Sequence, residues 1–175
     1  RGHAAVHEDG ETQRLAAVLV PLYCKSGEWH LLLCKRSYNL SAHPGEMAFP
    51  GGALEEEDGD YLNCALREAW EEVGINPKDV EILGSLDSVK TRSGFLVSPA
   101  VGMIPDSYEF VVSHGEVKEL VEVPVSQFYR RDNNRDEVHL RADGSLERQP
   151  TYVVGPHLVF GATARIIDNL LRLAI

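Results

Sequence analysis

The sequence contains no apolar run that approaches the roughly 20 residues needed to span a bilayer. It has only three cysteines, Cys24, Cys34 and Cys64, and no CxxC pair. These absences exclude a membrane-spanning helix and a cysteine-based metal site. An odd number of cysteines also argues against a disulfide framework, so we expect a reducing, cytoplasmic compartment.

Positive charge is scarce as well. The chain has 17 Lys and Arg residues against 27 Asp and Glu residues, which gives a net charge of −10. This balance argues against nucleic-acid or anionic-membrane partners, because phosphate surfaces attract basic patches. It leaves room for a small phosphorylated ligand that is held through divalent cations, while surface solubility explains the same charge without a ligand.

No repeat or low-complexity linker divides the 175 residues, of which 43% are apolar and 25% charged. These values are typical of one globular domain with a core of its own. Residues 1–13 are polar, and we expect them to be a flexible N-terminal segment or a tag remnant. The domain is then expected over residues 14–175.

The hydrophobic pattern predicts a mixed sheet packed between helices. The apolar stretch 14–24 and the stretch 27–37 are expected to form a hairpin, followed by a segment over 38–52 that is mostly loop. Apolar residues at helical spacing predict a helix over 61–73 that ends at Gly74. The remaining expected elements are strands near 80–86, 95–104 and 117–123, a hairpin around Asp143-Gly144, and a C-terminal helix that buries Ile166, Ile167, Leu170, Leu171 and Ala174.

Glu68, Glu71 and Glu72 crowd one face of the expected mid-chain helix. Like charges at this spacing destabilise a helix by roughly 0.2–0.5 kcal/mol per pair. A bound divalent cation would make the same arrangement favourable, because Mg²⁺ and Mn²⁺ prefer carboxylate oxygens. The alternative is a solvated acidic face with Arg67 as a local partner. In either case we expect this face to lie opposite much of the apolar stripe.

The run REAWEEVGI, from Arg67 to Ile75, resembles the end of the Nudix box, R-E-U-x-E-E-x-G-U with U apolar. Gly52 matches the opening glycine of that box. Asp58 stands at its first acidic position, where glutamate is usual. The segment between Asp58 and Arg67 is one residue longer than in the general box.

The segment Leu32 to Gly52 is similar to the signature of the coenzyme A diphosphatase branch: LLTxRS, a spacer with an Arg, a Gly, then FPGG. The matching residues are Leu32, Leu33, Arg36, Ser37, Gly45, Phe49, Pro50, Gly51 and Gly52. Cys34 replaces the Thr, and Ser41 stands where the spacer Arg is expected. The longer box and the segments 93–104 and 159–167 also resemble this branch, so the resemblance covers about residues 15–171.

The resemblance implies a Nudix fold, a mixed sheet between helices in an α/β/α sandwich. It also implies that box glutamates hold Mg²⁺ or Mn²⁺ against a diphosphate and that a glutamate is the general base. Carried onto this chain, the metal ligands and candidate bases are Glu68, Glu71 and Glu72, and Arg67 pairs with an acid of the box. Glu116 is the candidate ligand outside the box, with Glu119 second; the alternative for either is an exposed acid.

The implied substrate is a small nucleoside diphosphate compound, coenzyme A or its thioesters. Candidate substrate-binding residues are Lys35, Arg36, Gly51 and Gly52. The 3′-phosphate of coenzyme A needs further cations, for which Lys90 and Arg92 are candidates. His43 either contacts phosphate or lies on the surface of its loop.

Three other functions remain open at this stage. The same chemistry could act on another nucleoside diphosphate compound, such as ADP-ribose or NADH. The chain could be a Nudix-fold sensor that binds a nucleotide without turnover, although every glutamate of the box and its Arg are present. It could also be an acidic interaction domain. A homodimer is left open beside a monomer.

Overall fold

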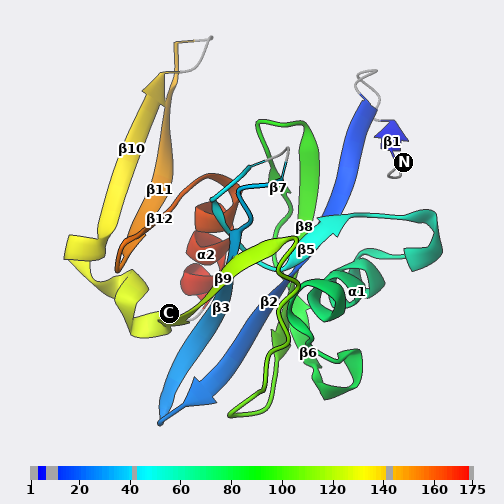
Figure 1. Cartoon of the computed structure of the whole chain (residues 1–175). Coiled ribbons are helices and arrows are strands. Elements are labelled where there is room, and N and C mark those ends of the chain that lie inside the picture. The colour runs from blue at the N-terminus through cyan, green and yellow to red at the C-terminus, as the bar shows by residue number, and fades with distance from the viewer. Residues whose placement is uncertain (1–3, 7–11, 41–42, 141–143, 174–175) are drawn as a thin grey trace.

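The structure is a computed structural model that describes residues 4–6, 12–40, 43–140 and 144–173 (Figure 1). Its strands are β1 Ala4–Val6, β2 Thr12–Lys25, β3 Glu28–Arg36, β4 Met47–Ala48, β5 Gly51–Ala53, β6 Glu81–Ser85, β7 Val89–Lys90, β8 Phe95–Met103, β9 Val117–Pro124, β10 Asn134–Leu140, β11 Leu146–Val154 and β12 His157–Val159. The α-helices are α1 Tyr61–Val73 and α2 Gly161–Leu173, and short 3-10 helices span Glu56–Asp58, Pro77–Asp79, Val125–Tyr129 and Arg131–Asn133.

The main sheet is mixed, as expected, with the strand order β4-β3-β2-β8-β6. β2 runs parallel to β8, while β3, β5 and the other paired strands run antiparallel to their neighbours. β2 and β3 form the predicted hairpin, with Cys24 opposite Trp29. β10 and β11 form the second predicted hairpin in a smaller sheet with β12; Asp143 of its turn lies outside the described residues.

The main sheet divides along β2. β3 pairs with residues 22–25 of β2, whereas β5 pairs with residues 16–18 on the same side of the strand. The backbone N–H of Leu19, between these two segments, donates to the carbonyl oxygen of Pro50 at 2.9 Å. The segment 49–52, here named the glycine turn, bends at Pro50 and enters β5. It is therefore fixed at the point where β3 separates from β2. The described part of the segment 38–52 is mostly loop, as predicted, although β4 and the start of β5 lie within it.

The two α-helices cover opposite faces of the main sheet (Figure 1). Alternate residues of β2 point to opposite faces, because side chains alternate along a strand. Leu15, Ala17 and Leu19 pack with α1, and Ala16 and Val20 pack with α2. The predicted α/β/α sandwich is confirmed. Neither helix of the described chain has the length and apolar character needed to cross a membrane.

Helix α1 has the predicted bounds, and local chemistry accounts for both ends. The side chain of Asp60 accepts a hydrogen bond from the backbone N–H of Asn63, which caps the first turn. Gly74 ends the helix with φ 74°, a left-handed conformation that glycine adopts without steric cost. Ala65, Ala69 and Val73 are buried against the sheet. The helix is thereby held in one orientation, which fixes where its glutamates point.

The predicted C-terminal helix is α2, which begins at Gly161. Ile166, Ile167 and Leu171 are buried and Leu170 is partly buried, whereas Ala174 lies outside the described residues. At the other end of the chain, β2 begins at Thr12 and β1 pairs with it. The domain boundary drawn before Arg14 remains a prediction.

Candidate active site

The glycine turn lies directly against the glutamates of helix α1. A Cβ atom on Gly52 would lie 2.3 Å from Oε1 of Glu68. The backbone N–H of Gly51 donates to Oε2 of Glu72 at 3.1 Å. Two glutamates one helical turn apart are thus held against the backbone of the FPGG segment. A methyl group at position 52 would therefore force the Glu68 carboxylate to move.

The three helix glutamates differ sharply in exposure. Glu72 is only 5% exposed and the Glu68 side chain 14%, whereas the Glu71 side chain is 52% exposed. The expectation of a single face opposite the apolar stripe is therefore wrong for Glu72. The reason is that the FPGG segment lies over this side of α1 and covers Glu72 and most of Glu68.

Burial changes the pKa values of Glu68 and Glu72. It raises the pKa of Glu72 to about 7, with Glu68 and Glu116 adding repulsion and the Gly51 N–H and Arg36 opposing the rise. It also raises the pKa of Glu68, against the stabilising effect of Arg67. Two acidic groups with raised pKa values beside each other are the pattern of a functional site.

Arg67 holds the segment between β5 and α1. Its Nε donates to Oδ1 of Asp58 at 2.7 Å and its Nη2 to Oδ2 at 3.0 Å. This fork lowers the pKa of Asp58, a buried carboxylate that also accepts the backbone N–H of Glu55. The predicted pairing of Arg67 with an acid of the box is confirmed. Nη1 of Arg67 also contacts Glu68 at 2.9 Å and Glu71 at 3.3 Å.

The two candidate metal ligands outside the Nudix box, Glu116 and Glu119, lie in different surroundings. Glu116 lies close enough to Glu68 and Glu72 to raise the pKa of both. Its backbone carbonyl accepts the N–H of Ser37 at 2.8 Å, which places it beside the end of β3. Glu119 instead faces His157, at 3.7 Å between Oε1 and Nε2. Of the two, the structure brings only Glu116 toward the cluster.

The donor chemistry of the cluster fits a hard divalent cation. Glu68 and Glu72 are carboxylates that burial has deprived of solvent, and Glu116 adds a third negative charge nearby. Within the described residues, however, no three acidic, His or Cys side chains already converge as a ligand set. Instead, Arg67 contacts Glu68 and Glu71, while Glu72 bonds to Gly51.

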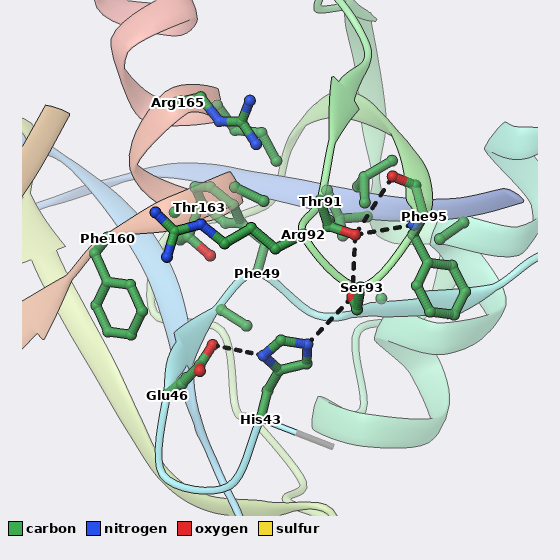
Figure 2. Close-up of a pocket in the computed structure, with 18 of the residues that line it drawn as sticks. His43, Glu46, Phe49, Thr91, Arg92, Ser93, Phe95, Phe160, Thr163 and Arg165 are labelled. Atoms are coloured by element: carbon green, nitrogen blue, oxygen red, sulfur yellow. Dashed lines mark hydrogen bonds and ion pairs between the residues drawn. The ribbon is translucent and has the colours of Figure 1, made fainter. Parts of the chain in front are cut away.

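On the α2 side of the glycine turn lies a cavity of about 530 Å³, the size of a small-molecule site (Figure 2). Gly51 and Gly52 form part of its wall, so the carboxylate cluster and the cavity share the same turn. Its charged and aromatic lining residues are Arg14, Arg36, His43, Glu46, Phe49, Arg92, Phe95, Glu137, Phe160 and Arg165.

The remaining predicted residues are divided between this cavity and other parts of the surface. Arg36, Arg92 and His43 line the cavity, whereas Lys35 does not; its Nζ lies 5.8 Å from the centre of the Tyr38 ring. Lys90 borders a smaller neighbouring pocket. Ser41, which replaces the spacer Arg, lies outside the described residues. Arg14, Phe160 and Arg165 line the cavity as well but were not predicted as site residues, although Phe160 and Arg165 lie in the segment 159–167 that resembles the coenzyme A diphosphatase branch.

Comparison with known proteins identifies the family. The model of the NUDIX domain matches residues 12–142. The Nudix hydrolase NudL of Pectobacterium atrosepticum, named as uncharacterized, is 40% identical over 164 residues, which cover 90% of this chain and 81% of that protein. The chain belongs to the Nudix hydrolase family. The NudL protein of Citrobacter koseri is similarly related, with 39% identity over 93% of this chain and 84% of its own.

Solved Nudix structures share the fold. A MutT/nudix family protein from Enterococcus faecalis has a TM-score of 0.60 at 17% identity, over 94% of this chain and 63% of that one. The Ap4A hydrolase of C. elegans has a TM-score of 0.55 at 20% identity, over 65% and 81%. The Nudix fold predicted from the box is confirmed. Nudix hydrolases generally use divalent metal ions such as Mg²⁺ or Mn²⁺, in keeping with the carboxylate cluster.

Proposed function

We propose that this Nudix hydrolase cleaves the diphosphate bond of coenzyme A or its thioesters. The observation that carries the proposal is the shared glycine turn, with buried Glu68 and Glu72 on one side and an arginine-lined cavity on the other. Water would add its hydroxyl to one phosphorus and its proton to the departing phosphate. The products would be 3′,5′-ADP and 4′-phosphopantetheine, or its acyl form.

Mg²⁺ or Mn²⁺ is the cofactor in this proposal. Glu68 and Glu72 would hold it, with Glu71 and Glu116 as further ligands. The ion would neutralise charge on the diphosphate and make water easier to deprotonate near neutral pH. One glutamate would accept the proton from the attacking water. Glu68, Glu71 and Glu72 all remain candidates for this base.

Arg36 is the residue best placed to help orient the diphosphate. It lines the cavity, and it lies close enough to Glu72 to lower the pKa of that carboxyl. Its Nε is buried without a hydrogen-bond partner among the described residues. A guanidinium between the carboxylates and the cavity can contact phosphate oxygens bidentately. Gly51 and Gly52 would let the ligand approach the backbone, while a role for Lys35 requires contact outside the cavity.

The proposal also covers the cellular compartment and the partners of the protein. The thiols of Cys34 and Cys64 are buried and unpaired, which fits the expected reducing, cytoplasmic compartment. The partner is a small molecule, and neither nucleic acid nor membrane is expected. The homodimer that the sequence left open remains a prediction that analytical ultracentrifugation would decide.

A substrate panel tests the proposal. The purified protein with Mg²⁺ or Mn²⁺ is offered coenzyme A, dephospho-coenzyme A, ADP-ribose and NADH, and products are separated by chromatography. We expect release of 3′,5′-ADP from coenzyme A, with slower turnover of the others. Glu72→Gln should lower this activity by about 10²–10⁴-fold, the usual range for a lost acid–base or charge-stabilising group. Glu81→Gln, at an exposed position on β6, is the control.

The other outcomes of the substrate panel would change the functional assignment. Faster turnover of ADP-ribose or NADH would retain the Nudix chemistry and withdraw the coenzyme A assignment. Absence of turnover, together with tight binding of one ligand, would favour the sensor. Full activity in Glu72→Gln would show that the buried carboxylate is not part of the machinery.

A further inference from the structure

The far wall of the cavity concentrates positive charge in an acidic protein. Arg92 and Arg165 both line it, from the loop after β7 and from the first turns of α2 (Figure 2). The acids that line the cavity are Glu46 and Glu137. Glu46 is hydrogen-bonded to His43, and Glu137 contacts His139 at 3.2 Å. Neither acid forms an ion pair with Arg92 or Arg165 among the described residues.

The two guanidiniums are close enough to repel each other. Burial lowers the pKa of Arg165, Glu147 acts in the opposite direction, and Arg92 lowers it further. Nη2 of Arg165 donates to the carbonyl oxygen of Lys90, but its Nε is buried without a partner in the described part of the chain. An anion between Arg92 and Arg165 would relieve the repulsion and accept charge-assisted hydrogen bonds from the two guanidiniums.

The loop that carries Arg92 is held in place by its neighbours (Figure 2). The Ser93 hydroxyl lies 3.1 Å from the Thr91 hydroxyl and 3.3 Å from Nε2 of His43. Arg14 donates to the carbonyl oxygen of Ser93, and its guanidinium lies over the Phe95 ring. Arg92 itself makes no hydrogen bond or ion pair with a described residue and reaches across the cavity toward the start of α2. Its backbone is therefore fixed while its guanidinium is available.

We propose that Arg92 and Arg165 form a subsite for a phosphate monoester of the ligand, separate from the diphosphate that is hydrolysed. This inference rests on the proposed function, because the diphosphate is assigned to the glycine turn at the near end of the same cavity. A coenzyme A molecule would place its 3′-phosphate in the subsite. Dephospho-coenzyme A, ADP-ribose and NADH have no phosphate in that position, so the subsite selects among diphosphate substrates.

The kinetic test compares two substrates that differ only in the 3′-phosphate. kcat/KM is measured for coenzyme A and dephospho-coenzyme A in the wild type, Arg92→Gln, Arg165→Gln and the double variant. We expect the preference for coenzyme A to fall by about 10–100-fold in the double variant, the effect of losing charge-assisted hydrogen bonds. Arg172→Gln is the matched control, because it makes the same charge change in the last turn of α2, away from the cavity.

A binding test separates failure of the subsite from failure of the proposed function. Calorimetry measures 3′,5′-ADP and 5′-AMP without metal, so no turnover is required. We expect 3′,5′-ADP to bind the wild type and Arg172→Gln at least about tenfold more tightly than 5′-AMP, and the double variant to lose this difference. Such binding without coenzyme A turnover would support the subsite and overturn the function.

Equal binding of both nucleotides by the wild type would overturn the subsite. An unchanged coenzyme A preference in a folded double variant would do the same. Circular dichroism establishes folding. If Arg165→Gln does not fold, Arg92→Gln decides alone, because Arg92 is exposed and without described partners.

Discussion

The two sides of the glycine turn are built in different ways. On the α1 side, Glu68 and Glu72 come from one continuous motif, and burial and close backbone contacts fix them. On the α2 side, the cavity is assembled from several separate segments, and some of its cations keep no described partner. The first side is rigid and crowded, whereas the second is open.

This difference assigns a different task to each side. Chemistry at a diphosphate requires positions fixed within fractions of an ångström, which a helix packed on a sheet can supply. Recognition of the rest of a ligand tolerates side chains that adjust to it. A change on the α1 side should therefore affect turnover of every substrate, and a change on the α2 side should affect the choice among substrates.

Among changes outside the glutamates themselves, the largest effect is expected from the contact that joins the two sides. In Gly52→Ala, the new Cβ would meet Oε1 of Glu68 at 2.3 Å, so the carboxylate must move. A displacement of about 1 Å costs about a hundredfold in rate. We expect kcat/KM to fall by about that factor for coenzyme A and dephospho-coenzyme A alike. Gly115→Ala is the matched control, since its added methyl meets open space. A substrate-dependent loss would contradict the division between the two sides.

A smaller effect concerns the cost of burying Glu72. Its folded-state pKa is raised to about 7, so the protonated carboxyl favours folding. That contribution is full below the unfolded pKa near 4.5 and is lost as the pH rises through about 7. Glu72→Gln cannot ionise and should escape this loss. In chelator, its stability relative to wild type should therefore rise by about 1–3 kcal/mol between pH 5 and pH 8.

Urea unfolding at each pH measures this difference. Glu81→Gln is the control, because it makes the same substitution at an exposed position on β6, away from the acidic cluster. Its stability relative to wild type should stay nearly constant over the same range. If the unfolding free energy of Glu72→Gln changes with pH in the same way as that of the wild type, burial does not raise the pKa of Glu72 as the structure indicates.

The α1 side was largely predictable from the sequence because its determinants are local. Helix α1 starts at the Asp60 cap and ends at Gly74, and the motif orders the glutamates between them. What the sequence could not give is the burial of Glu72. That burial depends on β5 folding over the helix from the point where β3 separates from β2, a long-range contact with no periodic signal.

The α2 side was much less predictable. Arg92 was a candidate cation, but Arg165 was only a member of an amphipathic helix with its apolar residues turned inward. Their approach depends on how β7, β8 and α2 pack, which no spacing along the chain encodes. The same holds for His43 and Ser93, fifty residues apart in sequence and hydrogen-bonded across the cavity rim.

The smallest effect on kinetics is expected from His43, whose exposed hydrogen bonds support the cavity on the α2 side. His43→Ala removes the hydrogen bonds to Glu46 and Ser93 that steady the Arg92 loop. Exposed polar pairs contribute about 0.2–1 kcal/mol, so we expect KM for coenzyme A to rise by about two- to fivefold with kcat nearly unchanged. Ser107→Ala is the control, because Ser107 is also exposed and shares a positive φ, 58° against 55°. A fall in kcat instead would place His43 with the reacting groups and would shift part of the chemistry to the α2 side.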